Sequence, residues 1–274
     1  MQLEEKYENL KNYIKELGSV VVAFSGGVDS TFLTKVCYDV LKDKAMAVTA
    51  TSSTYPEREF KEAIKLAEEI GVKHKIIRSE ELEIEGFSKN PINRCYYCKS
   101  ELFSKLKRVA DEEGMKYVLD GTNADDQGDF RPGRRAAKEL GVKSPLLECG
   151  FTKDDIRQMS LKLGLPTWNK PAYACLSSRF PYGEEITSQK LSMVERAEDY
   201  LLKLGFVGFR VRHHGDIARI ELRKDQINRM LNEDIRKDVV SKLKEIGFKY
   251  VAIDLEGYRT GSMNEAVSEL IQNV

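Results

Sequence analysis

Apolar runs that predict strands alternate with stretches of helical periodicity through the first half of the chain. In chain order the pattern predicts a strand at 19–24, a helix at 30–42, a strand at 45–51, a helix at 57–71, a strand at 73–78, a helix at 98–113 and a strand at 116–121. The strands are almost continuously apolar, which is typical of a parallel sheet with helices on both faces. Sheets of this kind bind ligands at the carboxyl ends of their strands.

The second half of the chain follows a different pattern. A helix predicted at 152–164 leads into a connector at 165–183 that gathers three prolines and the single tryptophan. The elements predicted after it are a helix at 187–204, strands at 209–215 and 217–223, two more helices and a strand at 250–256. We therefore predict an α/β fold, with an N-terminal parallel-sheet domain at 1–172 and a smaller C-terminal α+β domain at 173–274.

Composition narrows the class of protein. The 274 residues suit two domains, and the 44 basic and 44 acidic residues cancel, so no global field draws the chain to nucleic acid or membrane. The first 18 residues form a charged amphipathic stretch without an apolar signal region, and no apolar run is long enough to span a bilayer. We expect a cytoplasmic protein. An odd count of five cysteines there predicts metal binding or catalysis rather than a disulfide framework.

A glycine-rich loop follows the first strand. The sequence "FSGGVDS" places Ser25, Gly26, Gly27, Asp29 and Ser30 between a buried strand and a helix. Glycines let the backbone approach an oxyanion, and the helix start supplies free N–H groups with a favourable dipole. The serines add hydroxyl donors, and the aspartate can position Mg²⁺. The loop lacks the lysine that grips a terminal phosphate in P-loop proteins, and an ordinary capped turn is the alternative.

Polar turns follow two other predicted strands. "LDGTNADD" (119–126) brings Gly121, Asp125 and Asp126 after one strand, and "TATSS" (49–53) brings Thr51 to the end of another. From the residues alone, both segments are equally well explained as plain turns.

Three cysteines carry the second candidate chemistry. Cys95 and Cys98 form a CxxC pair, and Cys175 lies in the connector, whereas Cys37 and Cys149 are predicted to be structural. Three thiolates and an open fourth position suit a [4Fe–4S] cluster. Two alternatives stay open. One is a zinc site completed by His74, His213 or His214, and the other is a set of free thiols with Cys175 as a nucleophile.

The loop resembles the SGGxDS signature of the N-type ATP pyrophosphatases, or PP-loop enzymes. This resemblance implies that the loop binds the pyrophosphate part of ATP with Mg²⁺, with Asp29 and Ser30 catalytic. An acceptor is adenylated and pyrophosphate leaves, so no lysine for a transferable γ-phosphate is needed. The family places similar GTNxxD segments near the nucleotide and its metal, and the adenosine near Thr51.

Segments in both predicted domains resemble the LarE-type ATP-dependent sulfur transferases, which act in building the nickel-pincer nucleotide cofactor. They are "WNKPAYACLSSRFPYGEEIT", "RPGRRAAKELGV", "FRVRHHGDIARIE" and "GYRTGSMNE". In members with three cysteines, matching Cys95, Cys98 and Cys175, a [4Fe–4S] cluster is thought to carry a transferable sulfide. That sulfide would attack the adenylated carboxylate of a small nucleotide substrate.

The same resemblance implies a substrate site in the C-terminal domain. Arg210 and Arg212 match arginines near a phosphate, and Glu221 matches an acidic position that can hold a divalent metal. Ser178 and Arg179 are close enough to Cys175 in sequence to line its pocket. Without the resemblance, the two strand arginines would be interpreted as exposed charges.

Three other functions compete with this interpretation. A tRNA thiolase would keep the chemistry, but the neutral charge and five cysteines do not favour tRNA. A PP-loop amidotransferase or ligase would make the cysteines incidental, and a nucleotide sensor with a structural metal would release no pyrophosphate. The family also leads us to expect a homo-oligomer and an external sulfide donor.

Overall fold

The structure is a computed structural model that describes residues 2–79, 81–128, 132–171, 174–259 and 261–267. It divides into two units, and each is described by itself. The first comprises 1–81 and 93–173, and the second comprises 82–92 and 174–274. The predicted domain boundary between 172 and 173 lies outside the described residues.

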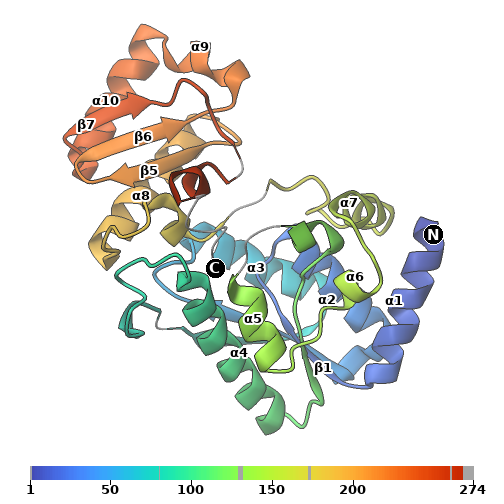
Figure 1. The fold of residues 1–274 in the computed structure, drawn as a ribbon. Coiled ribbons are helices and arrows are strands. Elements are labelled where there is room, and N and C mark those ends of the chain that lie inside the picture. The colour runs from blue at the N-terminus through green and yellow to red at the C-terminus, as the bar shows by residue number, and fades with distance from the viewer. Residues whose placement is uncertain (1, 80, 129–131, 172–173, 260, 268–274) are drawn as a thin grey trace. The chain divides into compact units, whose positions relative to one another are not determined.

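The first unit is built from alternating helices and strands (Figure 1). In chain order they are α1 (Leu3–Leu17), β1 (Val20–Ala23), α2 (Val28–Leu41), β2 (Ala45–Thr51), α3 (Glu57–Ile70), β3 (Lys73–Arg78), α4 (Arg94–Glu112), β4 (Tyr117–Leu119), α5 (Pro132–Glu139), α6 (Pro145–Glu148) and α7 (Lys153–Lys162).

The strands of this unit form a parallel sheet in the order β3-β2-β1-β4. Successive residues of a strand point to opposite faces, so β1 feeds two apolar clusters. Val20 and Val22 pack in the cluster that includes α1, α2 and α7, whereas Val21 packs with α4 and α5 on the other side. The predicted α/β fold with a two-sided parallel sheet is confirmed.

The second unit is α+β. Its elements are α8 (Ser188–Lys203), β5 (Arg210–His214), β6 (Ile217–Glu221), α9 (Ile227–Met230), α10 (Glu233–Ile246) and β7 (Tyr250–Ile253). Their strands make a mixed sheet in which β5 is antiparallel and β7 parallel to the central β6.

The segment at 82–92 joins the second unit although it precedes α4 in the chain. The buried Asn90 explains this. Its side-chain amide donates to the carbonyl of Pro181 at 2.6 Å, and its own carbonyl accepts from the Gly183 amide at 2.9 Å. The apolar pattern of the sequence does not predict that the segment at 82–92 packs with the second unit.

Two element predictions need correction. α4 begins at Arg94 rather than at 98. Asn93 is its N-cap, and both cysteines of the CxxC pair lie inside the helix. α5 was not predicted, since its pattern is short and mostly polar. The cap prediction at Thr152 is confirmed: its hydroxyl accepts from the Asp155 amide, and the Asp155 carboxylate accepts from the Thr152 amide.

Among the described residues, no helix combines the length and apolarity needed to cross a membrane.

The aromatic contacts of α2 give a stability prediction. Phe32 is fully buried, with ring centroids 5.5 Å from Phe151 and 6.3 Å from Tyr7. Phe32→Ala should lower the free energy of unfolding by about 3–5 kcal/mol, measured by urea denaturation. Leu161→Ala, at a side chain that is 54% exposed, is the control and should change it by less than about 0.5 kcal/mol. Equal effects of the two substitutions would contradict this packing.

Candidate nucleotide site and cysteine positions

The predicted phosphate loop connects β1 to α2. The Ser25 and Ser30 hydroxyls lie 3.2 Å apart, and the Ser30 hydroxyl donates to the Gly27 carbonyl at 3.3 Å. Gly27 is the N-cap of α2, so the loop ends where the helix presents its first amides. Ser25 is exposed and Ser30 is buried. The loop therefore has a fixed inner hydroxyl and an accessible outer one.

Two glycines let neighbouring segments approach the loop. Gly26 has a φ of 61°, and a Cβ there would lie 3.1 Å from the backbone of Ala63 on α3. Gly121 follows β4, and a Cβ there would lie 3.2 Å from the Ser30 amide nitrogen and 3.3 Å from Asp29 Cβ. The structure thus brings Gly121 against the loop, as expected for two neighbouring strands of one parallel sheet.

A lysine from α7 joins two of the predicted residues. The Lys153 ammonium forms an ion pair with Asp29, and its backbone amide donates to Asp125 Oδ2 at 2.8 Å. The sequence analysis missed this residue. The cap signal at Thr152 located the helix start, but nothing in the sequence indicated that this start faces the loop.

Asp29 is held in an unfavourable environment for its charge. Burial raises the pKa of its carboxyl above the ordinary 3.8, and the Lys153 ammonium opposes that rise. Its Oδ1 is buried and has no hydrogen-bond partner among the described residues. An incompletely satisfied carboxylate beside a phosphate loop is suited to bind a cation.

The predicted adenosine side lies at the end of β2. Thr51 is the last residue of that strand, and its carbonyl accepts from the Ser79 amide at 2.8 Å. The turn that follows contacts the loop through Tyr55, whose hydroxyl donates to the Ser25 carbonyl at 2.8 Å. Tyr55 is a second residue that the sequence analysis missed.

The CxxC pair lies at the start of α4, with Cys95 and Cys98 one helical turn apart. Cys95 is exposed and Cys98 is partly buried, with the Cys98 thiol 3.7 Å from Oε1 of the buried Glu81. Helix α5 lies beside α4 (Figure 1), and a Cβ at Gly133 would come within 3.2 Å of the Cys95 carbonyl oxygen. None of the five cysteines forms a disulfide.

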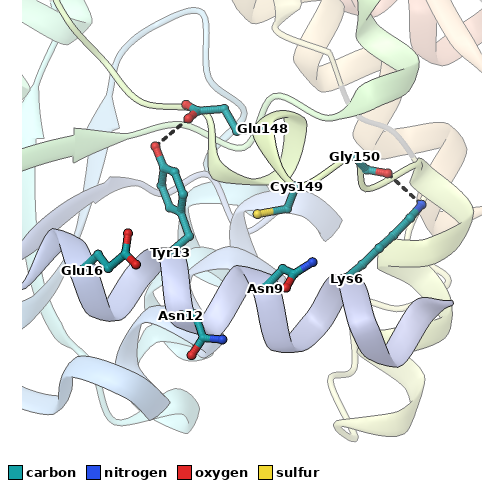
Figure 2. A pocket seen from close by; sticks show the side chains of 8 residues that line it. All are labelled: Lys6, Asn9, Asn12, Tyr13, Glu16, Glu148, Cys149 and Gly150. Carbon is teal, nitrogen blue, oxygen red and sulfur yellow. Dashed lines mark hydrogen bonds between the residues drawn. The ribbon is translucent and has the colours of Figure 1, made fainter. Parts of the chain in front are cut away.

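The other two cysteines of this unit, which were predicted to be structural, differ in burial. Cys37 is fully buried in the core, as predicted. Cys149 lines a cavity of about 440 Å³ between α1 and the end of α6, together with Asn9 and Asn12 (Figure 2). Burial raises the pKa of the Cys149 thiol to about 11, which disfavours the thiolate.

Cys175 lies in the second unit, on an exposed segment that begins a short 3₁₀ helix. Its carbonyl accepts from the Ser178 hydroxyl at 2.8 Å and from Arg179 Nη1 at 3.2 Å. Arg179 is fully buried and forms a two-bond ion pair with Glu198, at 2.9 and 3.0 Å. In this structure Arg179 therefore shapes the backbone at Cys175, and its predicted contact with a ligand stays a prediction.

The strand arginines are buried, so their interpretation as exposed charges is wrong. Arg212 donates to Glu221 Oε2 at 2.7 Å and to the Ser178 carbonyl at 2.9 Å. Arg210 stacks on the Tyr258 ring, and burial together with the nearby Arg179 lowers its pKa. Glu221 Oε1 also accepts from Arg219 at 3.0 Å. The structure thus joins Ser178, Arg212 and Glu221, while their roles in substrate and metal binding stay predictions.

The histidines offered as zinc ligands have other contacts. His74 lies 2.9 Å from the Thr49 hydroxyl, and His213 Nδ1 lies 2.7 Å from Glu184. Burial lowers the pKa of all three, including His214. Within the part of the chain that the structure describes, no three His, Cys, Asp or Glu side chains are assembled around a common metal position.

The environment of Asp29 predicts that replacing this residue by asparagine stabilises the protein, by an amount that depends on pH. The raised pKa means that ionised Asp29 costs stability as the pH rises above 3.8, so Asp29→Asn should be more stable than wild type at pH 7. The gain in the free energy of unfolding should be largest at neutral pH and should vanish toward pH 4. Asp43→Asn, at an exposed aspartate, should show no gain. A gain that persists undiminished at pH 3 would contradict this account.

Comparisons with known proteins agree with this geometry. The family model described as NAD synthase matches residues 2–91, which include the loop. A pyridinium-3,5-bisthiocarboxylic acid mononucleotide synthase from Lactiplantibacillus plantarum is 41% identical over 97% of this chain and 96% of its own length. An uncharacterised Synechocystis protein is 47% identical over 97% of this chain and all of its own length, and one from Methanocaldococcus jannaschii is 30% identical over 94% of each.

The match to the NAD synthase model covers the nucleotide loop and lies almost wholly in the first unit, whereas the likeness to the Lactiplantibacillus synthase extends through both units. The chain belongs to the LarE-type family of PP-loop ATP pyrophosphatases, which are enzymes.

Proposed function

We propose that this enzyme is an ATP-dependent sulfur transferase that converts a carboxylate of a pyridinium mononucleotide into a thiocarboxylate. The 41% identity to a pyridinium-3,5-bisthiocarboxylic acid mononucleotide synthase over 97% of the chain carries the proposal. A product with thiocarboxylic acids on a pyridinium ring implies a substrate with carboxylates at those positions.

The first step is adenylation at the loop after β1. A carboxylate oxygen of the substrate attacks the α-phosphorus of ATP, the bond from that phosphorus to the bridging oxygen breaks, and pyrophosphate leaves. The Ser25 hydroxyl and the first amides of α2 donate to the departing phosphates. The Lys153 ammonium, held beside the loop by Asp29, offsets the charge that develops on them.

Magnesium fits the acidic residues beside the loop. Asp29 has a buried oxygen without a partner, and the exposed Asp125 lies on the turn after β4. These two carboxylates would hold the ion, which supplies charge neutralisation to the phosphates when bound.

The second step replaces oxygen by sulfur. Hydrosulfide adds to the acyl carbon, the bond to the AMP oxygen breaks, and a thiocarboxylate, AMP and a proton result. Cys95, Cys98 and Cys175 would hold a [4Fe–4S] cluster, which supplies the sulfide when bound. The donor chemistry fits this role, because Cys95 and Cys98 lie one helical turn apart near the surface and Cys175 is exposed.

Three further sequence predictions remain part of this proposal. The sulfide comes from a separate donor, the chain assembles into a homo-oligomer, and it works in the cytoplasm. The zinc site stays an alternative to the cluster.

A PP-loop amidotransferase or ligase is the second candidate function. It is favoured by the match of residues 2–91 to the NAD synthase model, which covers the loop but not Cys95, Cys98 or Cys175. In that case ammonia would be the nucleophile and the CxxC pair would be dispensable.

The experiment uses anaerobically purified protein with ATP, Mg²⁺ and pyridinium-3,5-biscarboxylic acid mononucleotide. Sulfide is supplied in one reaction and ammonia in the other, and products are identified by mass spectrometry together with pyrophosphate release. Thiocarboxylate formed with sulfide, and no amide with ammonia, is the expected result. Amide formation would replace the proposal by the second candidate, and no pyrophosphate in either reaction would overturn both.

The two steps predict separable effects of cysteine substitutions. Cys95→Ser and Cys175→Ser should each abolish thiocarboxylate formation and lower the iron and acid-labile sulfide content. The substrate-dependent exchange of pyrophosphate into ATP should stay within about twofold of wild type, because it needs only the loop. Cys149→Ser is the matched control, since this thiol lines a separate cavity. If Cys95→Ser contained zinc, or if it transferred sulfur at the wild-type rate, the cluster would be removed from the proposal.

Lys153 predicts a defect in the first step. Lys153→Met should lower the rate of pyrophosphate exchange by about 10²–10³-fold, because a preorganised charge at the leaving group is lost. Lys162 lies on the same helix as Lys153 and forms an exposed ion pair with Glu4 of α1, and Lys162→Met should leave the rate unchanged. A rate in Lys153→Met equal to that of the control would show that Lys153 serves only the fold.

A further inference from the structure

Lys170 is a buried lysine that contacts the nucleotide loop from the connector after α7. Its ammonium donates to the Gly26 carbonyl at 3.1 Å and forms ion pairs with Glu59 at 2.8 Å and Glu62 at 2.9 Å. Lys170 and Glu59 are 9% and 5% exposed, so the charges are paired inside the protein. The three N–H donors of the Lys170 ammonium thus have three acceptors, which are the two glutamates on α3 and the Gly26 carbonyl in the loop.

The contact with Gly26 fixes the direction of a loop amide. In a trans peptide the carbonyl of one residue and the N–H of the next point in opposite directions. With its carbonyl held by Lys170, the Gly26–Gly27 peptide directs the Gly27 N–H away from the lysine. Gly26 has a positive φ and is packed against Ala63, so the peptide has few other arrangements.

The connector is anchored a second time at the same residue. Arg157 of α7 donates to the carbonyls of Trp168 at 2.7 Å and Lys170 at 2.8 Å. The Lys170 backbone is therefore fixed by α7, while its side chain is fixed by α3 and the loop. Lys153, the other lysine near the loop, begins the same helix.

We propose that Lys170 is a positioning residue for adenylation, which rests on the proposed function: it holds the Gly26 carbonyl so that the Gly27 N–H faces the pyrophosphate of ATP.

The test compares pyrophosphate and AMP as product inhibitors of thiocarboxylate formation. Lys170→Met with Glu59→Gln removes the lysine without leaving Glu59 as an unpaired buried charge. The inhibition constant for pyrophosphate should rise about tenfold or more, since a hydrogen bond to a charged group loses its alignment. The constant for AMP should stay within about twofold, because the contacts of Lys170 among the described residues are with Gly26, Glu59 and Glu62 and not with Thr51 of the predicted adenosine side.

Two variants keep the test valid if the double variant does not fold. Glu62→Gln removes a partner that is 45% exposed and should raise the pyrophosphate constant by about twofold to fivefold. Lys170→Arg keeps the charge and should recover part of the pyrophosphate affinity. Lys35→Met, which breaks a partly exposed ion pair within α2, is the control and should match wild type.

The outcomes separate this inference from the proposed function. An unchanged pyrophosphate constant in folded variants would overturn the role of Lys170, and so would an equal loss of pyrophosphate and AMP affinity. Wild type that neither exchanges pyrophosphate nor is inhibited by it would instead overturn the proposed function.

Discussion

The absence of a side chain at Gly26 is the constraint on which the nucleotide site depends. α3 approaches so closely that a Cβ would lie 3.1 Å from the Ala63 backbone, and the positive φ disfavours any other residue. Gly121 lets the turn after β4 approach the other side of the loop. Because both neighbours are packed against it, the loop is shaped before a nucleotide binds. Such preorganisation is what makes fixed donors effective on a leaving group.

The charges around the loop come from distant parts of the chain. Lys153 begins α7 and pairs with Asp29, whereas Lys170 lies in the connector and pairs with Glu59 and Glu62. The first side chain is partly exposed and can follow a phosphate, while the second is buried and fully paired. One lysine is thus suited to the changing charge of a reaction and the other to holding a backbone.

Apolar periodicity and short motifs predicted the strands, the parallel sheet and the loop, because each depends on neighbouring residues. The buried charges could not be predicted in this way. The sequence of α3 has the pattern of an amphipathic surface helix. Glu59 of this helix is nevertheless buried, and it is paired with Lys170, which lies more than a hundred residues later in the chain. Arg212 looked like an exposed strand charge because the segment that covers it, with Ser262, follows some fifty residues later. Both depend on tertiary contacts that leave no local pattern.

A continuous set of contacts joins the nucleotide loop to the CxxC pair within the first unit. Lys153 links Asp29 of the loop to the turn after β4, and Arg134 of α5 donates to the carbonyl of Asp126 on that turn at 3.3 Å. The neighbouring Gly133 packs against the Cys95 carbonyl. Because Gly133 has no side chain that could act as a spacer at this contact, α5 lies directly against the start of α4. The contacts of Arg134 and Gly133 therefore fix the position of the two α4 cysteines relative to the turn after β4.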